Sequence, residues 1–124
     1  KAIDEYEFEL ELTSDLPEEI GVGAALENLT WTPDVDIRNS FFGSCRARGL
    51  LVSTPGKVVI ENNVFESSGS AILIAGDANY WYESGAVKDV LIKGNDFRYP
   101  CMSSMYQFCE AIISSPARYE VSVP

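Results

Sequence analysis

The chain has 124 residues, enough for one domain with a modest hydrophobic core. Its 19 acidic residues against 9 basic ones give a formal net charge of −10, and such a surface repels the phosphate backbone of nucleic acids. The chain contains no histidine, so any acid–base chemistry falls to Asp, Glu, Tyr, Lys or Cys. No apolar run approaches the roughly 20 residues that a membrane-spanning helix needs. The composition therefore argues against nucleic-acid and membrane partners.

Residues 4–12 alternate acidic and apolar side chains, with Tyr6, Phe8, Leu10 and Leu12 on the apolar side. This period of two predicts a half-buried strand with one solvated, acidic face. A face that binds calcium or a cationic ligand is the alternative interpretation of the glutamate row. After a turn around Pro17, residues 20–27 are small and apolar and indicate a second strand.

From residue 33 onward one pattern, V-x-I-x-x-N-x-F, occurs three times with small variations. The copies begin at Val35, Val58 and Val90, 23 and 32 residues apart. A second apolar run follows each copy, over residues 49–52, 71–74 and 111–113. Two short strands in a unit of about 22 residues, with asparagine at the turn, indicate a solenoid whose coils stack at about 4.8 Å.

Equivalent side chains of successive coils are predicted to stack in columns. The asparagines form a hydrogen-bonded ladder, and Phe42, Phe65 and Phe97 form an internal aromatic column. A leucine-rich repeat is disfavoured because the aliphatic residues are Val and Ile and no segment has a helical period. The predicted fold is all-β: a right-handed parallel β-helix of about three coils over residues 31–124, preceded by a short β-strand segment over residues 1–30.

Two insertions interrupt the repeat, around residues 75–85 and 98–107, and loops that leave a rigid solenoid are common functional sites. The first insertion carries Asp77 and Glu83, which are candidates for the two carboxyl groups of glycoside hydrolysis. Its aromatic and amide groups can pack against sugar rings and bond to hydroxyls: Asn79, Tyr80, Trp81 and Tyr82. Two alternatives remain open, namely that Asp77 is a turn residue and that the aromatics only pack the side of the solenoid.

Arg48, Ser70 and Glu110 each precede the small residue that opens a second apolar run. Stacking therefore predicts the three at one height, with Arg48 and Glu110 about 10 Å apart. Arg46 is expected to share the face of Arg48, and the two arginines can hold hydroxyls and tune a carboxylate. The alternative is a structural Arg48–Glu110 pair between coils.

Three cysteines, Cys45, Cys101 and Cys109, provide neither a disulfide framework nor zinc-ligand spacing. Cys101 and Cys109 are the natural pair if one forms, and partly buried free thiols are the alternative. The chain starts at Lys1 without a signal peptide, which suggests a processed or excised piece.

Residues 26–115 contain the segments CRARGLLVST, GDANYWYESG and QFCEAIIS, which resemble the bacterial exo-acting α-1,3-galactosidases that remove terminal galactose from blood-group-B-type glycans. The resemblance implies a right-handed parallel β-helix, no metal or other cofactor in catalysis, a glycan with terminal α-galactose as substrate, and a periplasmic or secreted location. It also implies inversion, for which the two carboxyl groups lie about 6.5–9.5 Å apart.

The resemblance favours Asp77 as the first catalytic carboxylate and Glu83 as the second. The implied substrate contacts are Arg46, Arg48, Asn79, Trp81, Tyr82 and Glu110. Family members are several times longer, so the chain is interpreted as a fragment whose exposed coil ends favour homo-oligomers. A non-catalytic carbohydrate-binding module and a purely structural β-helix segment are the alternative functions.

Overall fold

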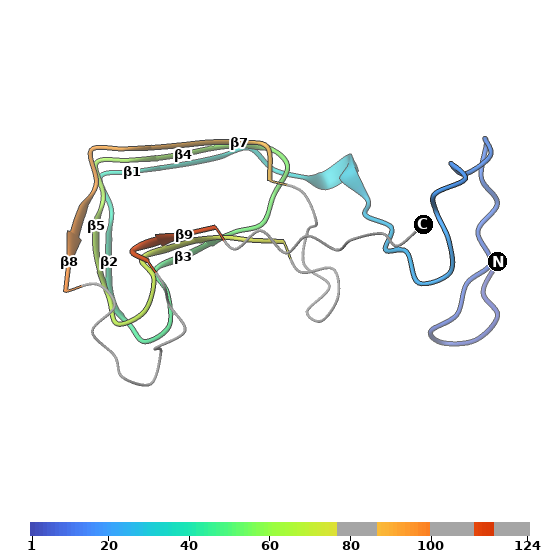
Figure 1. Cartoon of the computed structure of the whole chain (residues 1–124), viewed down its shortest axis with the longest axis horizontal. Coiled ribbons are helices and arrows are strands. Elements are labelled where there is room, and N and C mark those ends of the chain that lie inside the picture. Colours follow the sequence, from blue (N-terminus) through green and yellow to red (C-terminus); the bar gives the residue numbers. More distant parts are fainter. Residues whose placement is uncertain (77–86, 100–110, 116–124) are drawn as a thin grey trace.

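The computed structural model describes residues 1–76, 87–99 and 111–115 (Figure 1). These residues form one short 3-10 helix, η1, and nine β-strands. The elements are η1 (Leu29–Trp31), β1 (Val35–Arg38), β2 (Phe41–Cys45), β3 (Leu50–Val52), β4 (Lys57–Glu61), β5 (Val64–Ser67), β6 (Ile72–Ile74), β7 (Asp89–Lys93), β8 (Asp96–Arg98) and β9 (Ile113–Ser114). The predicted all-β class is therefore confirmed for the described residues.

The strands form three parallel three-stranded sheets, with the orders β1-β4-β7, β2-β5-β8 and β3-β6-β9. The chain contributes one strand to each sheet before it returns to the first sheet. We call these passes turn 1 (β1–β3), turn 2 (β4–β6) and turn 3 (β7–β9), and Figure 1 shows them superposed along the stacking direction. All the pairs between neighbouring turns are parallel.

The register confirms the alignment of the three repeat copies. Val58 of turn 2 pairs with Val35 on one side and with Val90 on the other. The phenylalanine column forms as predicted: the ring centroid of Phe65 lies 4.8 Å from that of Phe42 and 5.4 Å from that of Phe97, and both pairs are stacked. The repeat pattern in the sequence is thus a pattern of direct contacts in space.

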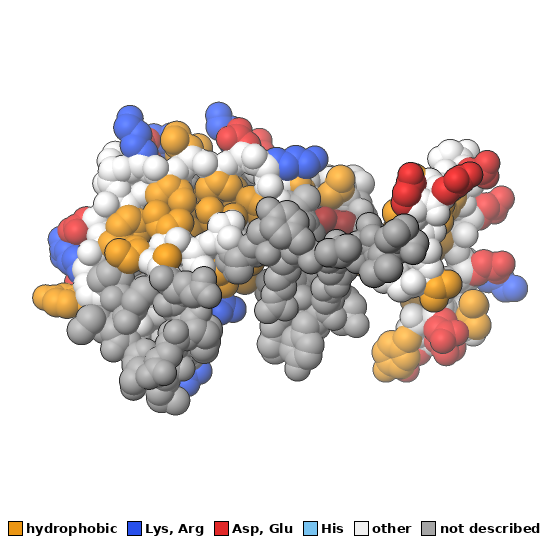
Figure 2. Space-filling model, viewed as in Figure 1, with side chains coloured by type: hydrophobic (Ala, Val, Ile, Leu, Met, Phe, Trp, Pro, Cys, Tyr) orange, Lys and Arg blue, Asp and Glu red, His pale blue; other side chains and the backbone are white. Residues whose placement is uncertain are grey.

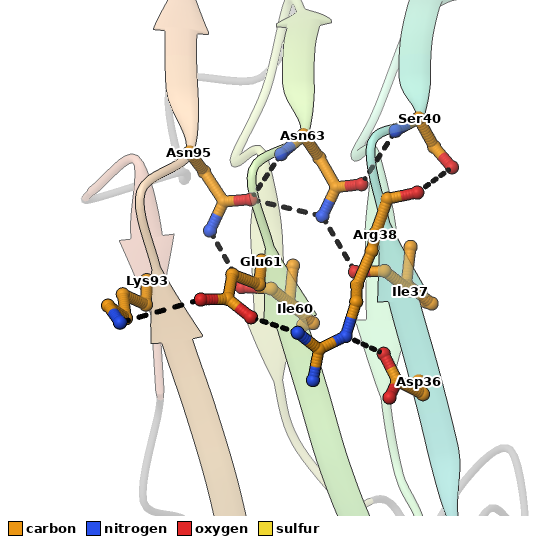
Figure 3. A network of polar contacts seen from close by, with 9 residues as sticks. All are labelled: Asp36, Ile37, Arg38, Ser40, Ile60, Glu61, Asn63, Lys93 and Asn95. Carbon is orange, nitrogen blue, oxygen red and sulfur yellow. Dashed lines mark hydrogen bonds and ion pairs between the residues drawn. The ribbon is translucent and has the colours of Figure 1, made fainter.

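The asparagine ladder also forms, and it bonds to the backbone as well as to itself (Figure 3). The Asn63 side chain donates to the Ile37 carbonyl at 2.9 Å and to Asn95 Oδ1 at 3.0 Å, and the Asn63 backbone N–H donates to the same Oδ1 at 2.9 Å. Asn95 donates in turn to the Ile60 carbonyl at 2.8 Å. Asn63 is 1 % exposed, so the ladder satisfies a buried polar group.

In turn 1 the ladder position belongs to Ser40, whose backbone N–H donates to Asn63 Oδ1 at 3.0 Å. Asn39, the asparagine of the first repeat copy, lies one position earlier and has φ of +50°. Asn62 and Gly94 occupy the same position in turns 2 and 3, with φ of +58° and +64°. This corner needs a left-handed residue in every turn, and asparagine and glycine tolerate that conformation best.

A β-bulge reconciles the unequal lengths of turns 1 and 2. Phe42 pairs with Phe65, but Cys45 pairs with Ser67, so β2 holds one residue more than β5 between these pairs. Ser44, at the bulge, has φ of +58°. The extra residue is absorbed locally, and the following strands pair without a shift.

The core lies between the three sheets and is centred on turn 2. Val58, Ile60, Phe65 and Ile72 are at most 2 % exposed. Their turn 3 counterparts Val90, Ile92 and Phe97 are only partly buried, and Ile113 is 39 % exposed. Figure 2, which looks along the stack, shows apolar side chains gathered on the end face of the turns.

The strands predicted over residues 4–12 and 20–27 are absent from the structure. In the first 28 residues the only pairing is an isolated antiparallel bridge between Ala2 and Phe8. Tyr6, Phe8 and Leu10 are 82 %, 61 % and 66 % exposed. The alternating pattern predicts a strand, but a strand also needs a neighbour to pair with, and the described residues supply none.

Candidate functional site

Arg46 and Arg48 lie in the short connection between β2 and β3. Exposure alternates along this connection, with both arginines exposed and Cys45, Ala47 and Gly49 partly buried between them. The prediction that the two arginines share a face is consistent with this alternation. Gly49 is fixed by close packing, because a Cβ there would lie 2.7 Å from both the Ala71 carbonyl and the Phe65 ring.

The corner that carries the arginines continues in turn 2 at residues 68–71, where the chain passes from β5 to β6. Leu50 pairs with Ile72, and the same register places Arg48 level with Ser70, as predicted. Ser70 is 3 % exposed and its hydroxyl donates to the Ala111 carbonyl at 2.8 Å. This buried serine is therefore a structural link between turns 2 and 3.

One step of the predicted stacking is wrong by one residue. Ile72 pairs with Ile113, whereas stacking Arg48, Ser70 and Glu110 at one height requires Ile72 to pair with Ile112. Ala111, rather than Glu110, is consequently the residue in register with Ser70. The apolar run Ala111-Ile112-Ile113 offers two equivalent isoleucines, and sequence alone does not distinguish them.

The first insertion starts at the opposite end of the same sheet. The Ala75 backbone N–H donates to the Val52 carbonyl at 3.0 Å, and Gly76 is the last described residue before Asp77. The arginines thus precede β3, whereas the insertion follows β6, the strand beside β3. Each strand has three residues and spans about 10 Å, so the two arginines and the first residues of the insertion lie at opposite ends of this sheet.

Most of the predicted site lies outside the described residues. This holds for both candidate carboxylates and for the remaining candidate contacts: Asp77, Glu83, Asn79, Trp81, Tyr82 and Glu110. Their roles stay predictions. Cys101 and Cys109 also lie outside, while Cys45 is a partly buried free thiol.

A row of ion pairs on the outer face of the β1-β4-β7 sheet was not anticipated from the sequence (Figure 3). Glu61 pairs with Arg38 of turn 1 and, at 3.5 Å, with Lys93 of turn 3. These three residues share one repeat position, so their charges alternate as plus, minus, plus along the stack. The signal was present in the aligned copies, because each carries a charged residue just after the isoleucine.

Neighbouring carboxylates favour the charged form of two exposed arginines, Arg38 on β1 and Arg98 on β8. A hydrogen bond from Arg38 to Asp36, at 2.6 Å, raises the pKa of the Arg38 guanidinium, and the charges of Asp36 and Glu61 add to this. Likewise, a hydrogen bond to Asp96 raises the pKa of Arg98. All of these side chains except Glu61 are largely exposed, so the pairs read as a solvated structural row rather than as a reactive site.

The described part of the chain contains no group of three His, Cys, Asp or Glu side chains that could hold a metal ion. In the same residues, no helix is long and apolar enough to cross a membrane.

No family model matches the chain. Curated relatives do: the chain is 74 % identical over 114 residues to an alpha-1,3-galactosidase B of Bacteroides thetaiotaomicron, and this match covers 92 % of the chain and 18 % of the relative. An alpha-1,3-galactosidase A of Bacteroides fragilis is 55 % identical over 72 % of the chain and 15 % of the relative. An alpha-1,3-galactosidase B of Akkermansia muciniphila is 47 % identical over 87 % of the chain and 14 % of the relative. The chain spans less than a fifth of the length of each.

Proposed function

The chain corresponds to a segment of the alpha-1,3-galactosidases, and on that premise we propose that it is part of a longer glycoside hydrolase that removes terminal α-1,3-linked galactose from glycans. The observation that carries the proposal is the 74 % identity to an alpha-1,3-galactosidase B over 92 % of the chain. Because the match covers 18 % of that relative, the activity is proposed for the longer protein.

We further propose that the three turns are coils of a right-handed parallel β-helix. The parallel pairs between successive turns and the ladders of phenylalanine and asparagine support this architecture. Right-handedness is the general rule for connections between parallel strands of one sheet. In this arrangement the corners carry the site, while the strands fix its position.

In the proposed reaction Asp77 and Glu83 act as the acid–base pair. One carboxyl group donates a proton to the glycosidic oxygen as the C1–O bond breaks, and the other takes a proton from a water molecule that attacks C1 from the opposite face. This single displacement inverts the configuration at C1 and releases β-galactose. It requires no cofactor.

The other candidates are proposed to bind the sugar. Arg46 and Arg48 are exposed on one face at the corner before β3 and can donate to hydroxyls. The Asn79 amide can donate or accept, and the Glu110 carboxylate can accept. Trp81 and Tyr82 offer flat apolar faces to the C–H groups of a galactose ring. A glycan substrate also suits a periplasmic or secreted enzyme, which we propose as its location.

The test is hydrolysis of a terminal α-1,3-galactosyl disaccharide by the full-length protein, with the released anomer followed by NMR. We expect β-galactose to appear first and Asp77→Asn to lower kcat by at least about a hundredfold, the usual contribution of a general acid or base. Arg48→Gln is expected to raise KM. Arg98→Gln is the matched control, because Arg98 pairs with Asp96 on the outer face of a different sheet and should leave both constants unchanged.

The same assay separates the alternative functions. If the full-length protein binds the disaccharide but leaves it intact, carbohydrate binding takes the place of hydrolysis as the proposed function. If the full-length protein neither binds nor hydrolyses any α-galactoside tried, the remaining alternative is a purely structural β-helix segment. An Asp77→Asn variant that retains full activity would remove Asp77, but not the galactosidase activity, from the proposal.

A further inference from the structure

Ser70, at the corner that joins β5 to β6, is bonded to the backbone of the turn on each side of its own. Its carbonyl accepts a hydrogen bond from the Gly49 N–H at 3.3 Å, and its hydroxyl donates to the Ala111 carbonyl at 2.8 Å. Gly49 directly follows Arg48 in the sequence. Ala111 directly follows Glu110 and is the first described residue after the gap at residues 100–110. One buried residue is thus bonded to the immediate neighbours of two candidate sugar contacts.

The Ser70 hydroxyl bonds to a carbonyl that a backbone N–H would otherwise reach. Between turns 1 and 2, the Gly49 N–H donates to the Ser70 carbonyl. By the register of turns 2 and 3, the equivalent donor is the Ala71 N–H and the equivalent acceptor is the Ala111 carbonyl. The Ala71 N–H donates instead to the Ile112 carbonyl, at 2.8 Å. The Ala111 carbonyl accepts from the Ser70 hydroxyl, so the place of Ala111 in the stack depends on a side chain.

The repeat itself does not require a serine at this position. Arg48 occupies it in turn 1 and Ala111 in turn 3. A buried hydroxyl also needs a partner, because burying one without a hydrogen bond is unfavourable. Ser70 is 3 % exposed and finds its partner in the next turn. What distinguishes this serine is therefore the backbone that it holds, beside Glu110.

We propose that Ser70 is a positioning residue for Glu110. The Ser70 hydroxyl holds the backbone of Ala111, and a single peptide bond joins Ala111 to Glu110. The bond from Gly49 ties the same serine to the corner of Arg48, so one buried residue sets the spacing between both candidate contacts. The inference rests on the proposed function, in which Glu110 and Arg48 contact the sugar, while Ser70 touches no substrate.

Kinetics of the full-length protein test the positioning role. Ser70→Ala is expected to raise KM for the terminal α-1,3-galactosyl disaccharide about two- to tenfold, the range that corresponds to the loss of one neutral hydrogen bond, and to change kcat little. Ser67→Ala is the matched control. Ser67 is also 3 % exposed, but its hydroxyl donates to the Gly69 carbonyl within the same turn. An unchanged KM in Ser70→Ala, or an equal rise in Ser67→Ala, would overturn the proposal.

A double-mutant cycle separates positioning from general damage to the fold. If Ser70 acts through Glu110, Ser70→Ala has no further effect on KM once Glu110→Ala is present. Effects of the two substitutions that simply multiply would mean that Ser70 acts elsewhere, and the proposal would fail.

Crystal structures of the full-length protein and of its Ser70→Ala variant test the positioning without any activity. We expect the Ser70 hydroxyl to be bonded to the Ala111 carbonyl in the first, and residues 110 and 111 to be displaced in the second. Residues 110 and 111 that stay in place would refute the positioning role, whatever the activity. A displacement in a protein that is inactive on α-galactosides would support the positioning and contradict the proposed function.

Discussion

Turns 2 and 3 carry the same repeat, in register, and yet differ sharply in burial. Ile60 and Phe65 of turn 2 are 0 % and 1 % exposed, whereas their partners Ile92 and Phe97 in turn 3 are only partly buried. The residue types are the same, so the difference comes from the neighbours. Turn 2 has a turn on each side, and turn 3 has one described neighbour. A single turn cannot bury its own inward side chains, and the stack supplies the core.

Truncation of the phenylalanine column is expected to have the largest effect on stability. Phe65→Ala is expected to lower the free energy of unfolding of the chain by about 3–5 kcal/mol, because it opens a cavity between two stacked rings. Phe97→Ala should cost clearly less, since its ring has one stacked partner among the described residues and is already partly exposed. Urea denaturation followed by circular dichroism measures both. Equal costs would mean that turn 3 is as well buried as turn 2.

The asparagine ladder gives the next largest difference. Asn63→Ala leaves the Ser40 N–H and the Ile37 carbonyl without their partner inside the stack, at an expected cost of about 2–3 kcal/mol in unfolding free energy. Asn95→Ala is expected to cost less, because water can reach a partly exposed position. The urea midpoints of the two variants decide the order, and a cheaper Asn63→Ala would contradict the buried ladder.

The left-handed corner gives a smaller effect. Gly94→Ala should destabilise the chain by about 1 kcal/mol, since an L-residue with a Cβ is strained at φ of +64°. The added Cβ also lies 2.5 Å from Asn62 Oδ1, the end of an exposed side chain that can move. Gly94→Asn is the matched control and should cost less, because turns 1 and 2 already place asparagine there. Thermal denaturation compares the two variants.

The smallest expected effect is Glu61→Gln. It removes the central charge of the outer row, but Arg38 and Lys93 are exposed enough for water and salt to screen both pairs. We expect a loss of stability below that of Gly94→Ala, which fades as salt is added. A denaturation midpoint measured at low and high ionic strength checks this, and a loss that persists in high salt would show that the row is buried more deeply than it appears.

The sequence was sufficient to predict the features that depend on contacts within the repeat. The alignment of Val35, Val58 and Val90, the phenylalanine column and the ladder of Asn63 and Asn95 all follow from one eight-residue pattern. The alignment also sets Asn39 beside Asn62 and Ser40 beside Asn63, but residue type alone does not tell which of these two neighbouring polar positions is the left-handed corner and which is the ladder.

Features that depend on something outside the repeat were harder to predict. The alternation in residues 4–12 indicates which side chains share a face, but pairing needs a second strand, and no described residue offers one. At the candidate site, the exposed positions of Arg46 and Arg48 agree with the sequence prediction. The roles of Asp77 and Glu83 stay predictions that rest on residue type and on the similarity to galactosidases. Neither of these fixes where an inserted loop lies.

The corners of this molecule differ greatly in length while the strands stay in register. Four residues, 53–56, join β3 to β4, and 14 residues, 75–88, join β6 to β7, yet β4 and β7 pair over five consecutive positions. Because loop closure costs little more as a loop lengthens, such a corner accepts new sequence almost without penalty to the stack. The sequence of this corner can therefore change during evolution while the paired strands stay the same, and a protein engineer could graft foreign peptides at the same place.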